Sequence, residues 1–164
     1  TTVVTTIIAP VPTPTVSPSP RTSTTAFTAV LPAGVLQYAY VSEQPAADWQ
    51  AAGALEAWTD TYGDGGSGAL TVQAGQFATA DAATAFAATL VGTLPSVAPK
   101  PAATGAPALP ATGQVEVGGT AVGTYTIVDG GDGTGVAVWS NGTAVFRMVA
   151  PVADIRNAYA AFPL

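Results

Sequence analysis

The run GVAVWSNGTAVFRMVAP at 135–151 places two apolar, β-prone stretches on either side of Asn141-Gly142. Asn and Gly tolerate the positive φ angles that both central residues of a type I′ turn need, so the dipeptide predicts a tight β-hairpin. With this turn, Trp139 is expected opposite Ala144. Alternation predicts one face with Ala137, Trp139, Ala144, Phe146 and Met148, and another with Val136, Val138, Val145, Arg147 and Val149.

A lone hairpin is marginally stable in water, so this ribbon must belong to a larger sheet. Apolar patterns bounded by glycine-rich turns predict further strands at 34–41, 54–62, 69–77, 114–117 and 120–128. A helix is expected over 79–94, with Thr79 as its cap and Asp81 in its first turn. Pro151 is expected to begin a final helix, where its missing N–H costs nothing. This order predicts an α+β fold, a mainly antiparallel sheet of about seven strands with two helices packed against it.

Five prolines, at positions 10, 12, 14, 18 and 20, punctuate the segment 9–25. Proline fixes its own φ and favours extended geometry in its predecessor, so the segment is expected to adopt polyproline II and act as a semi-rigid spacer. We therefore divide the chain into a Thr/Pro/Ser-rich stalk or arm at 1–26 and a single α+β domain at 27–164. A second Pro/Ala-rich stretch, at 95–111, is expected to be a long loop within that domain.

The first eight residues, TTVVTTII, are β-branched throughout. Three interpretations remain open: the outer end of a membrane-spanning helix, a strand added to another sheet edge, or a disordered tail. Because the chain starts at Thr1 rather than Met, we expect an upstream membrane anchor or a cleaved signal peptide. The expected location is extracytoplasmic, either cell-surface anchored or secreted.

The amino-acid composition excludes several kinds of catalytic and binding site. The chain has no cysteine and no histidine, which excludes disulfides and thiolate nucleophiles and removes the commonest general base and transition-metal ligand. Charged residues make up 9% of the chain and the formal net charge is −6, so no basic surface is expected for nucleic acid. We therefore expect no cofactor and no catalysis, although an enzyme working with carboxylates alone stays an alternative.

Two glycine-rich turns resemble ligand-binding motifs. Residues 63–68 match G-x-G-x-x-G, but a strand rather than a helix is expected next, so a hairpin turn explains the spacing. Asp129 with Asp132, and Asp60 with Asp64, could supply oxygens to calcium, but Asp and Gly also fill tight turns for backbone reasons.

One strand carries a candidate ligand face. Glu56, Trp58, Asp60 and Tyr62 alternate in sequence, so they are expected on one side of the strand. Acids interleaved with aromatic rings occur on sugar-binding surfaces, but they are more often an ordinary half-exposed strand face.

Three functions follow from these observations. The leading one is a non-catalytic extracytoplasmic domain, displayed on its stalk as an interaction or structural module that meets a protein or cell-wall partner. The first alternative is a small-ligand or glycan binder or sensor using the face around Trp58. The second is a filament subunit that self-associates through residues 1–9 as a donor strand.

Overall fold

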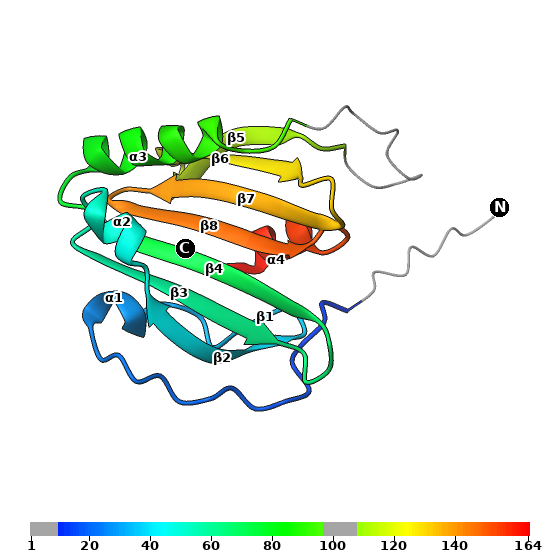
Figure 1. Ribbon diagram of the computed structural model, residues 1–164. Helices are drawn as coiled ribbons and strands as arrows, with labels where there is room; N and C mark the ends of the chain where they lie inside the picture. Colours follow the sequence, from blue (N-terminus) through cyan, green and yellow to red (C-terminus); the bar gives the residue numbers. More distant parts are fainter. Residues whose placement is uncertain (1–9, 97–107) are drawn as a thin grey trace.

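An eight-stranded antiparallel sheet with the order β1-β2-β3-β4-β8-β7-β6-β5 forms the centre of the structure (Figure 1). This is a computed structural model that describes residues 10–96 and 108–164, so the predictions for 1–9 and for most of the 95–111 loop lie outside the described residues. The strands are β1 (Gly34–Val35), β2 (Tyr38–Pro45), β3 (Glu56–Gly63), β4 (Ala69–Gln76), β5 (Ala111–Val117), β6 (Thr120–Asp129), β7 (Thr134–Asn141) and β8 (Ala144–Pro151). The helices are α1 (Ala26–Ala29), α2 (Ala47–Ala51), α3 (Ala80–Gly92) and α4 (Ile155–Ala161). The α+β prediction is confirmed, with eight strands rather than about seven.

Helices lie on both faces of the sheet, and each face has its own core (Figure 1). On one face, α4 packs Ile155, Ala158 and the adjoining Phe162 against a core that includes Trp139 and Phe146. On the other face, α2 and α3 cover part of the sheet through a smaller apolar cluster: Ala46, Trp49, Ala54, Ala57, Phe77, Ala83, Ala87 and Val145. Thr79 caps α3 as predicted, because its Oγ1 accepts the backbone N–H of Ala82 at 3.1 Å.

The pairing expected for the 135–151 hairpin is wrong by two residues. Trp139 lies opposite Phe146 rather than Ala144, and Asn141 stays in the ladder opposite Ala144. Gly142, with φ 58°, is the first central residue of the turn, and its N–H donates to the carbonyl oxygen of Val122 at 2.9 Å. Because a shift of two residues preserves the alternation of side chains, the two predicted faces are still correct.

Two element boundaries also differ from the predictions. The strand expected at 34–41 is split by a tight turn in which Leu36 has a φ of 51°, so β1 and β2 form a short hairpin of their own. Pro151 ends β8, opposite Thr134, instead of beginning the last helix. Val152 then donates its N–H to the carbonyl of Gly133, and this bond holds the chain at the sheet before α4 begins at Ile155.

The proline-rich segment, expected to be a spacer, lies along the domain from Pro14 onward (Figure 1). A Cβ placed on Gly34 would lie 3.0 Å from the Pro14 side chain, and one on Gly65 would lie 2.6 Å from Val16. Farther along, the N–H of Ser19 donates to the carbonyl of Tyr40 in β2 at 2.9 Å. The segment therefore covers the outer edge of β2 beyond the two-residue β1, which protects that edge from pairing with other chains. We call residues 10–25 the arm.

None of the helices in 10–96 and 108–164 has both the length and the apolar character needed to cross a membrane.

Candidate functional site

The four residues predicted as a ligand face do share one side of β3, and they are linked to one another there. The indole N–H of Trp58 donates to Glu56 Oε1 at 2.8 Å, and the Tyr62 hydroxyl lies 3.5 Å from Asp60 Oδ2. Asp60 is 1% exposed and Tyr62 is fully buried, whereas Glu56 and Trp58 are half-buried. The inner half of this face is therefore closed to solvent.

Arg21 of the arm closes the inner half of this face. Its Nη1 lies 2.7 Å from Asp60 Oδ2 and 3.1 Å from Glu43 Oε2. Its Nη2 donates to the Tyr62 hydroxyl at 3.3 Å and to the Pro32 carbonyl at 3.2 Å, and the guanidinium carbon lies 4.1 Å from the centre of the Tyr40 ring. We call Tyr40, Glu43, Asp60 and Tyr62, together with the Pro32 carbonyl, the Arg21 cradle.

The pairing of β2 with β3 builds the cradle. Tyr40 lies opposite Tyr62, and Glu43 lies opposite Asp60, with a register shift between Tyr40 and Ser42. Residues directly opposite each other in an antiparallel pair lie on the same face, so this register brings two acids and two aromatic rings together. The Tyr40 and Tyr62 rings meet edge to face with centroids 6.0 Å apart, which fixes the aromatic wall of the cradle.

The residues after Arg21 continue the attachment. Glu43 Oε1 accepts the hydroxyl of Thr22 at 3.0 Å and the backbone N–H of Ser23 at 2.6 Å. Thr25 bonds through its hydroxyl to Glu56 Oε1 and also caps α1, because its Oγ1 accepts the N–H of Thr28. The arm thus contacts the predicted ligand face at Tyr62, Asp60 and Glu56, and Trp58 stays half-buried.

Burial and pairing shift the two carboxyl groups in opposite directions. Burial raises the pKa of Asp60 and outweighs the ion pair with Arg21, which acts to lower it. Burial also acts to raise the pKa of Glu43, but hydrogen bonds from Ser23, Thr22 and Arg21 bring it below its ordinary value. Asp60 Oδ1 is buried without a hydrogen-bond partner among the described residues. The cradle therefore contains one buried acceptor, Asp60 Oδ1, to which none of the described residues donates.

Acid is expected to weaken the folded state through Glu43. Because its folded-state pKa lies below the ordinary value of 4.5, the unfolded chain takes up a proton first as the pH falls through that value. The stabilisation is therefore complete above pH 4.5 and is lost below it, with Asp60, whose pKa is raised, offsetting part of the loss. Urea unfolding between pH 7 and pH 3 measures this slope. Glu43→Gln should flatten it, and an unchanged slope would contradict the assignment.

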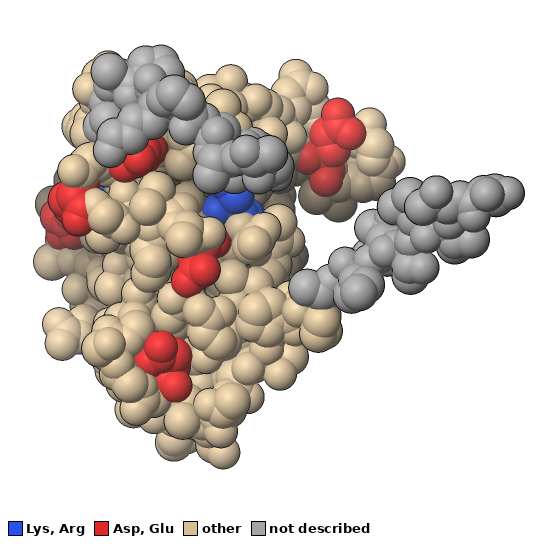
Figure 2. Space-filling model, turned by 90° about the vertical axis from the view of Figure 1, so that its right-hand side faces the viewer, with Lys and Arg blue, Asp and Glu red and all other residues tan. Residues whose placement is uncertain are grey.

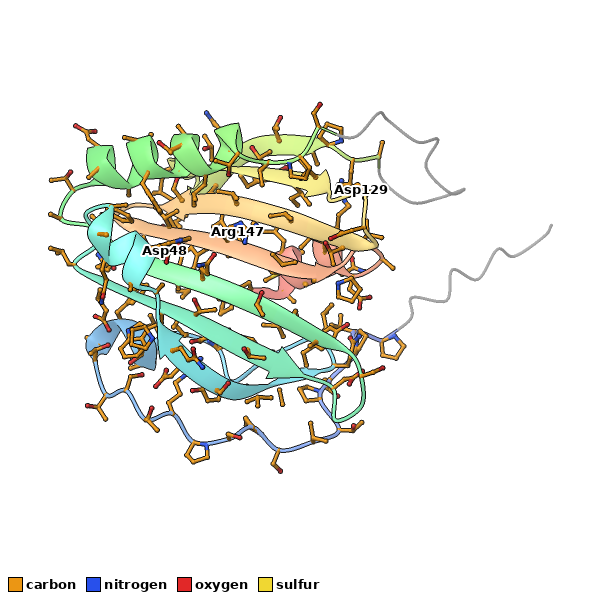
Figure 3. All side chains as sticks on the ribbon, viewed as in Figure 1. Asp48, Asp129 and Arg147 are labelled. Atoms are coloured by element: carbon orange, nitrogen blue, oxygen red, sulfur yellow. The ribbon has the colours of Figure 1, made fainter. Side chains whose placement is uncertain are left out.

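The opposite face of the sheet is polar and open across β3, β4 and β8. Thr59, Gln73 and Arg147 lie in one row across β3, β4 and β8, and Thr61 lies opposite Thr71 in the next row. All five side chains are half-buried, and Figure 1 shows α2 and α3 covering only the neighbouring part of this face. In Figure 3, Arg147 lies near the middle of β8, apart from the labelled Asp48 of α2 and Asp129 at the end of β6. We call Thr59, Thr61, Thr71, Gln73 and Arg147 the open face.

Arg147 has no carboxylate within ion-pair distance in the described part of the chain. Its Nη1 reaches Gln73 Oε1 at 3.5 Å, the long limit of a hydrogen bond. By contrast, Arg21 has two acidic partners. On the end of the molecule drawn in Figure 2, acidic side chains are scattered and little basic surface is visible. A half-buried guanidinium among hydroxyl and amide groups, as on the open face, is suited to an anionic or carbonyl-rich contact.

Three of the four aspartates considered for calcium are used by the turns themselves, and the fourth, Asp60, is paired with Arg21 inside β3. Asp129 Oδ1 accepts the N–H of Gly131, and Asp132 Oδ1 accepts both the N–H and the hydroxyl of Thr134. Asp64 Oδ1 accepts the N–H of Gly66 and of Gly68 in the other turn. Within 10–96 and 108–164, no three side chains of the metal-ligating acidic types gather at one point. The backbone explanation accounts for these residues.

Sequence reasoning missed Arg21 and Glu43, the two residues that complete the site. One signal was present: Arg21 is the first charged residue of the chain, and Glu43 is the second. A lone cation in an uncharged proline-rich run, followed by a lone acid in the first long strand, could have been paired by charge alone.

Comparison with protein-family models, with curated proteins and with solved structures finds no match to this chain. Function must therefore be argued from the geometry of the cradle and of the open face.

Proposed function

We propose that this chain is a non-catalytic interaction or structural module of the cell envelope, located outside the cytoplasmic membrane. One observation carries the proposal: the arm fills the acidic face that could have served chemistry, while the open face on the other side of the sheet stays uncovered. Neither carboxylate of the cradle is free to transfer protons, because both are paired with Arg21 and shielded from solvent.

The open face is the surface we assign to the partner. Its threonine and glutamine side chains offer donors and acceptors in register across three strands, and Arg147 adds one cation that lacks an acidic partner in the described ranges. A protein or cell-wall polymer that presents carboxylate and carbonyl oxygens fits this chemistry. The low charge of the chain favours such a contact over long-range electrostatic attraction.

Sedimentation of the full chain with purified peptidoglycan and with isolated envelope proteins tests the assignment. We expect saturable binding to one of these fractions, and Arg147→Gln should weaken it at least about tenfold because a charge-assisted hydrogen bond contributes roughly 1.5–3 kcal/mol. Arg156→Gln is the matched control, since within residues 10–96 and 108–164 that arginine forms no ion pair and donates to the Ala108 carbonyl at 3.2 Å. Binding that Arg147→Gln leaves unchanged, or the absence of binding to every fraction, would contradict the proposal.

A glycan-binding function keeps one supporting observation. Trp58 is half-buried at the outer end of the predicted face, so part of its ring is accessible beside Glu56 while Asp60 and Tyr62 are closed off. Only this outer end could stack on a sugar while the arm is in place. The filament alternative depends on residues 1–9, which lie outside the described residues.

A further inference from the structure

The Arg21 cradle has the composition of a receptor for an arginine side chain. We propose that the cradle and the adjoining edge of β2 recognise an arginine in an extended Ser/Thr/Pro-rich segment of another polypeptide chain, and that Arg21 occupies this site as an intramolecular ligand. The inference concerns a different surface from the open face and does not depend on it.

The contacts suit a guanidinium group specifically. Two carboxylates bind Nη1 from different strands, while Nη2 donates to a hydroxyl and to a backbone carbonyl. The planar group also lies over the Tyr40 ring at 4.1 Å, an arrangement in which cation–π attraction adds to the ion pairs. An ammonium group could not satisfy the two directions of this fork at once, so lysine is a poor substitute.

The backbone of the ligand is recognised as well. Ser19 donates its N–H to Tyr40 of β2, and Ser23 donates its N–H to Glu43, so main-chain contacts flank Arg21 on both sides. Pro18 and Pro20 favour an extended conformation before binding, which lowers the entropy lost when the segment docks. An extended peptide that docks at a strand edge is a common recognition mode, in which main-chain bonds give affinity and pockets give specificity.

The cradle belongs to the domain rather than to the arm. Strand pairing sets Glu43 opposite Asp60 and Tyr40 opposite Tyr62, and the Tyr62 hydroxyl donates to the Pro32 carbonyl at 2.9 Å. The buried Asp60 Oδ1, unpaired within the described ranges, shows that the site has acceptor capacity beyond what Arg21 uses. A site assembled by the sheet can receive the same group from a second chain when the arm withdraws.

Competition by the arm then controls access. A tethered ligand acts at a high effective concentration, in the millimolar range for short flexible connections, so a free peptide must compete against it. Weakening the contact between Arg21 and the cradle of its own chain should therefore expose the cradle. Arg21→Ala removes both ion pairs and the ring contact but leaves the cradle residues intact.

Fluorescence anisotropy with a labelled peptide of the sequence SPSPRTSTT, which is that of residues 17–25, tests the proposal on the full chain. We expect saturable binding to the Arg21→Ala variant. Binding to the unaltered chain should be at least about tenfold weaker, because its own Arg21 already occupies the cradle. The peptide with alanine in place of arginine should not bind, and Asp60→Asn added to Arg21→Ala should weaken binding. Arg156→Ala, the matched control, should behave like the unaltered chain.

A second measurement tests the proposal if the Arg21→Ala variant folds poorly. If Arg21→Ala unfolds easily, the peptide should raise its midpoint of thermal unfolding, and methylguanidinium should do so more than methylammonium at equal concentration. Equal binding by the variant and the unaltered chain would overturn the proposal. So would binding that does not require the peptide's arginine, or a midpoint that neither peptide nor methylguanidinium changes.

Discussion

Arg21→Ala is expected to lower the free energy of unfolding by about 3–5 kcal/mol, because removing one partner of a buried ion pair leaves an uncompensated charge. Here the substitution would leave two carboxylates, whose side chains are 1% and 2% exposed, facing each other without a cation. It would also remove the contact with the Tyr40 ring. Urea unfolding at pH 7, followed by far-UV circular dichroism, measures the change.

Two further variants separate this effect from a general loss of charge. Arg156→Ala should change stability by less than about 0.5 kcal/mol, since surface substitutions of this kind usually do. Adding Asp60→Asn to Arg21→Ala should cost less than the sum of the two single changes, because the second change removes one of the stranded charges. A loss below about 1 kcal/mol for Arg21→Ala would place the pair among ordinary surface salt bridges and contradict the account.

Trp139→Ala is expected to cost about 3–5 kcal/mol, the usual range for deleting a fully buried aromatic side chain. Trp139 is 0% exposed and stacks on Phe146, with ring centroids 5.0 Å apart. It also meets Phe162 edge to face, and its indole N–H donates to the carbonyl of Leu164 at 2.8 Å. The side chain therefore joins the central hairpin to the C-terminal residues, and thermal unfolding would register the loss as a lower midpoint.

Trp139→Phe is the matched control, because it keeps a ring in the core and removes the indole donor. It should be clearly milder than Trp139→Ala, with about 1 kcal/mol of its cost coming from the lost hydrogen bond. Equal destabilisation by the two variants would mean that the hydrogen bond to Leu164, rather than ring packing, dominates at this position.

The sequence patterns predicted the sheet well because alternation is a local property. The two faces of the 135–151 hairpin came out correctly even though Trp139 pairs with Phe146 instead of Ala144, since a two-residue shift does not exchange faces. In the observed pairing, the N–H of Gly142 donates to the carbonyl of Val122 in the neighbouring β6. Turn propensity at Asn141-Gly142 contains no information about that third strand.

Only the part of the candidate site that lies on β3 was predictable, again because alternation is a local property. Alternation placed Glu56, Trp58, Asp60 and Tyr62 on one side of a strand, which is where they lie. What covers that side comes from far along the chain, because Arg21 and Glu43 are 22 residues apart and their meeting depends on how the arm returns to β2. Prolines indicate that a segment is extended, but they do not indicate whether it projects into solvent or lies along a sheet edge.

Backbone amide hydrogen exchange of the full chain tests the central claim that the arm is bound to the domain. The N–H groups of Ser19 and Ser23 donate to Tyr40 and Glu43, so we expect both to exchange far more slowly than in the free peptide SPSPRTSTT. Arg21→Ala should accelerate exchange at both positions while leaving the amides of β7 and β8 protected. Exchange of Ser19 and Ser23 in the unaltered chain at the rate of the free peptide would show that the segment is a detached spacer and would contradict the account.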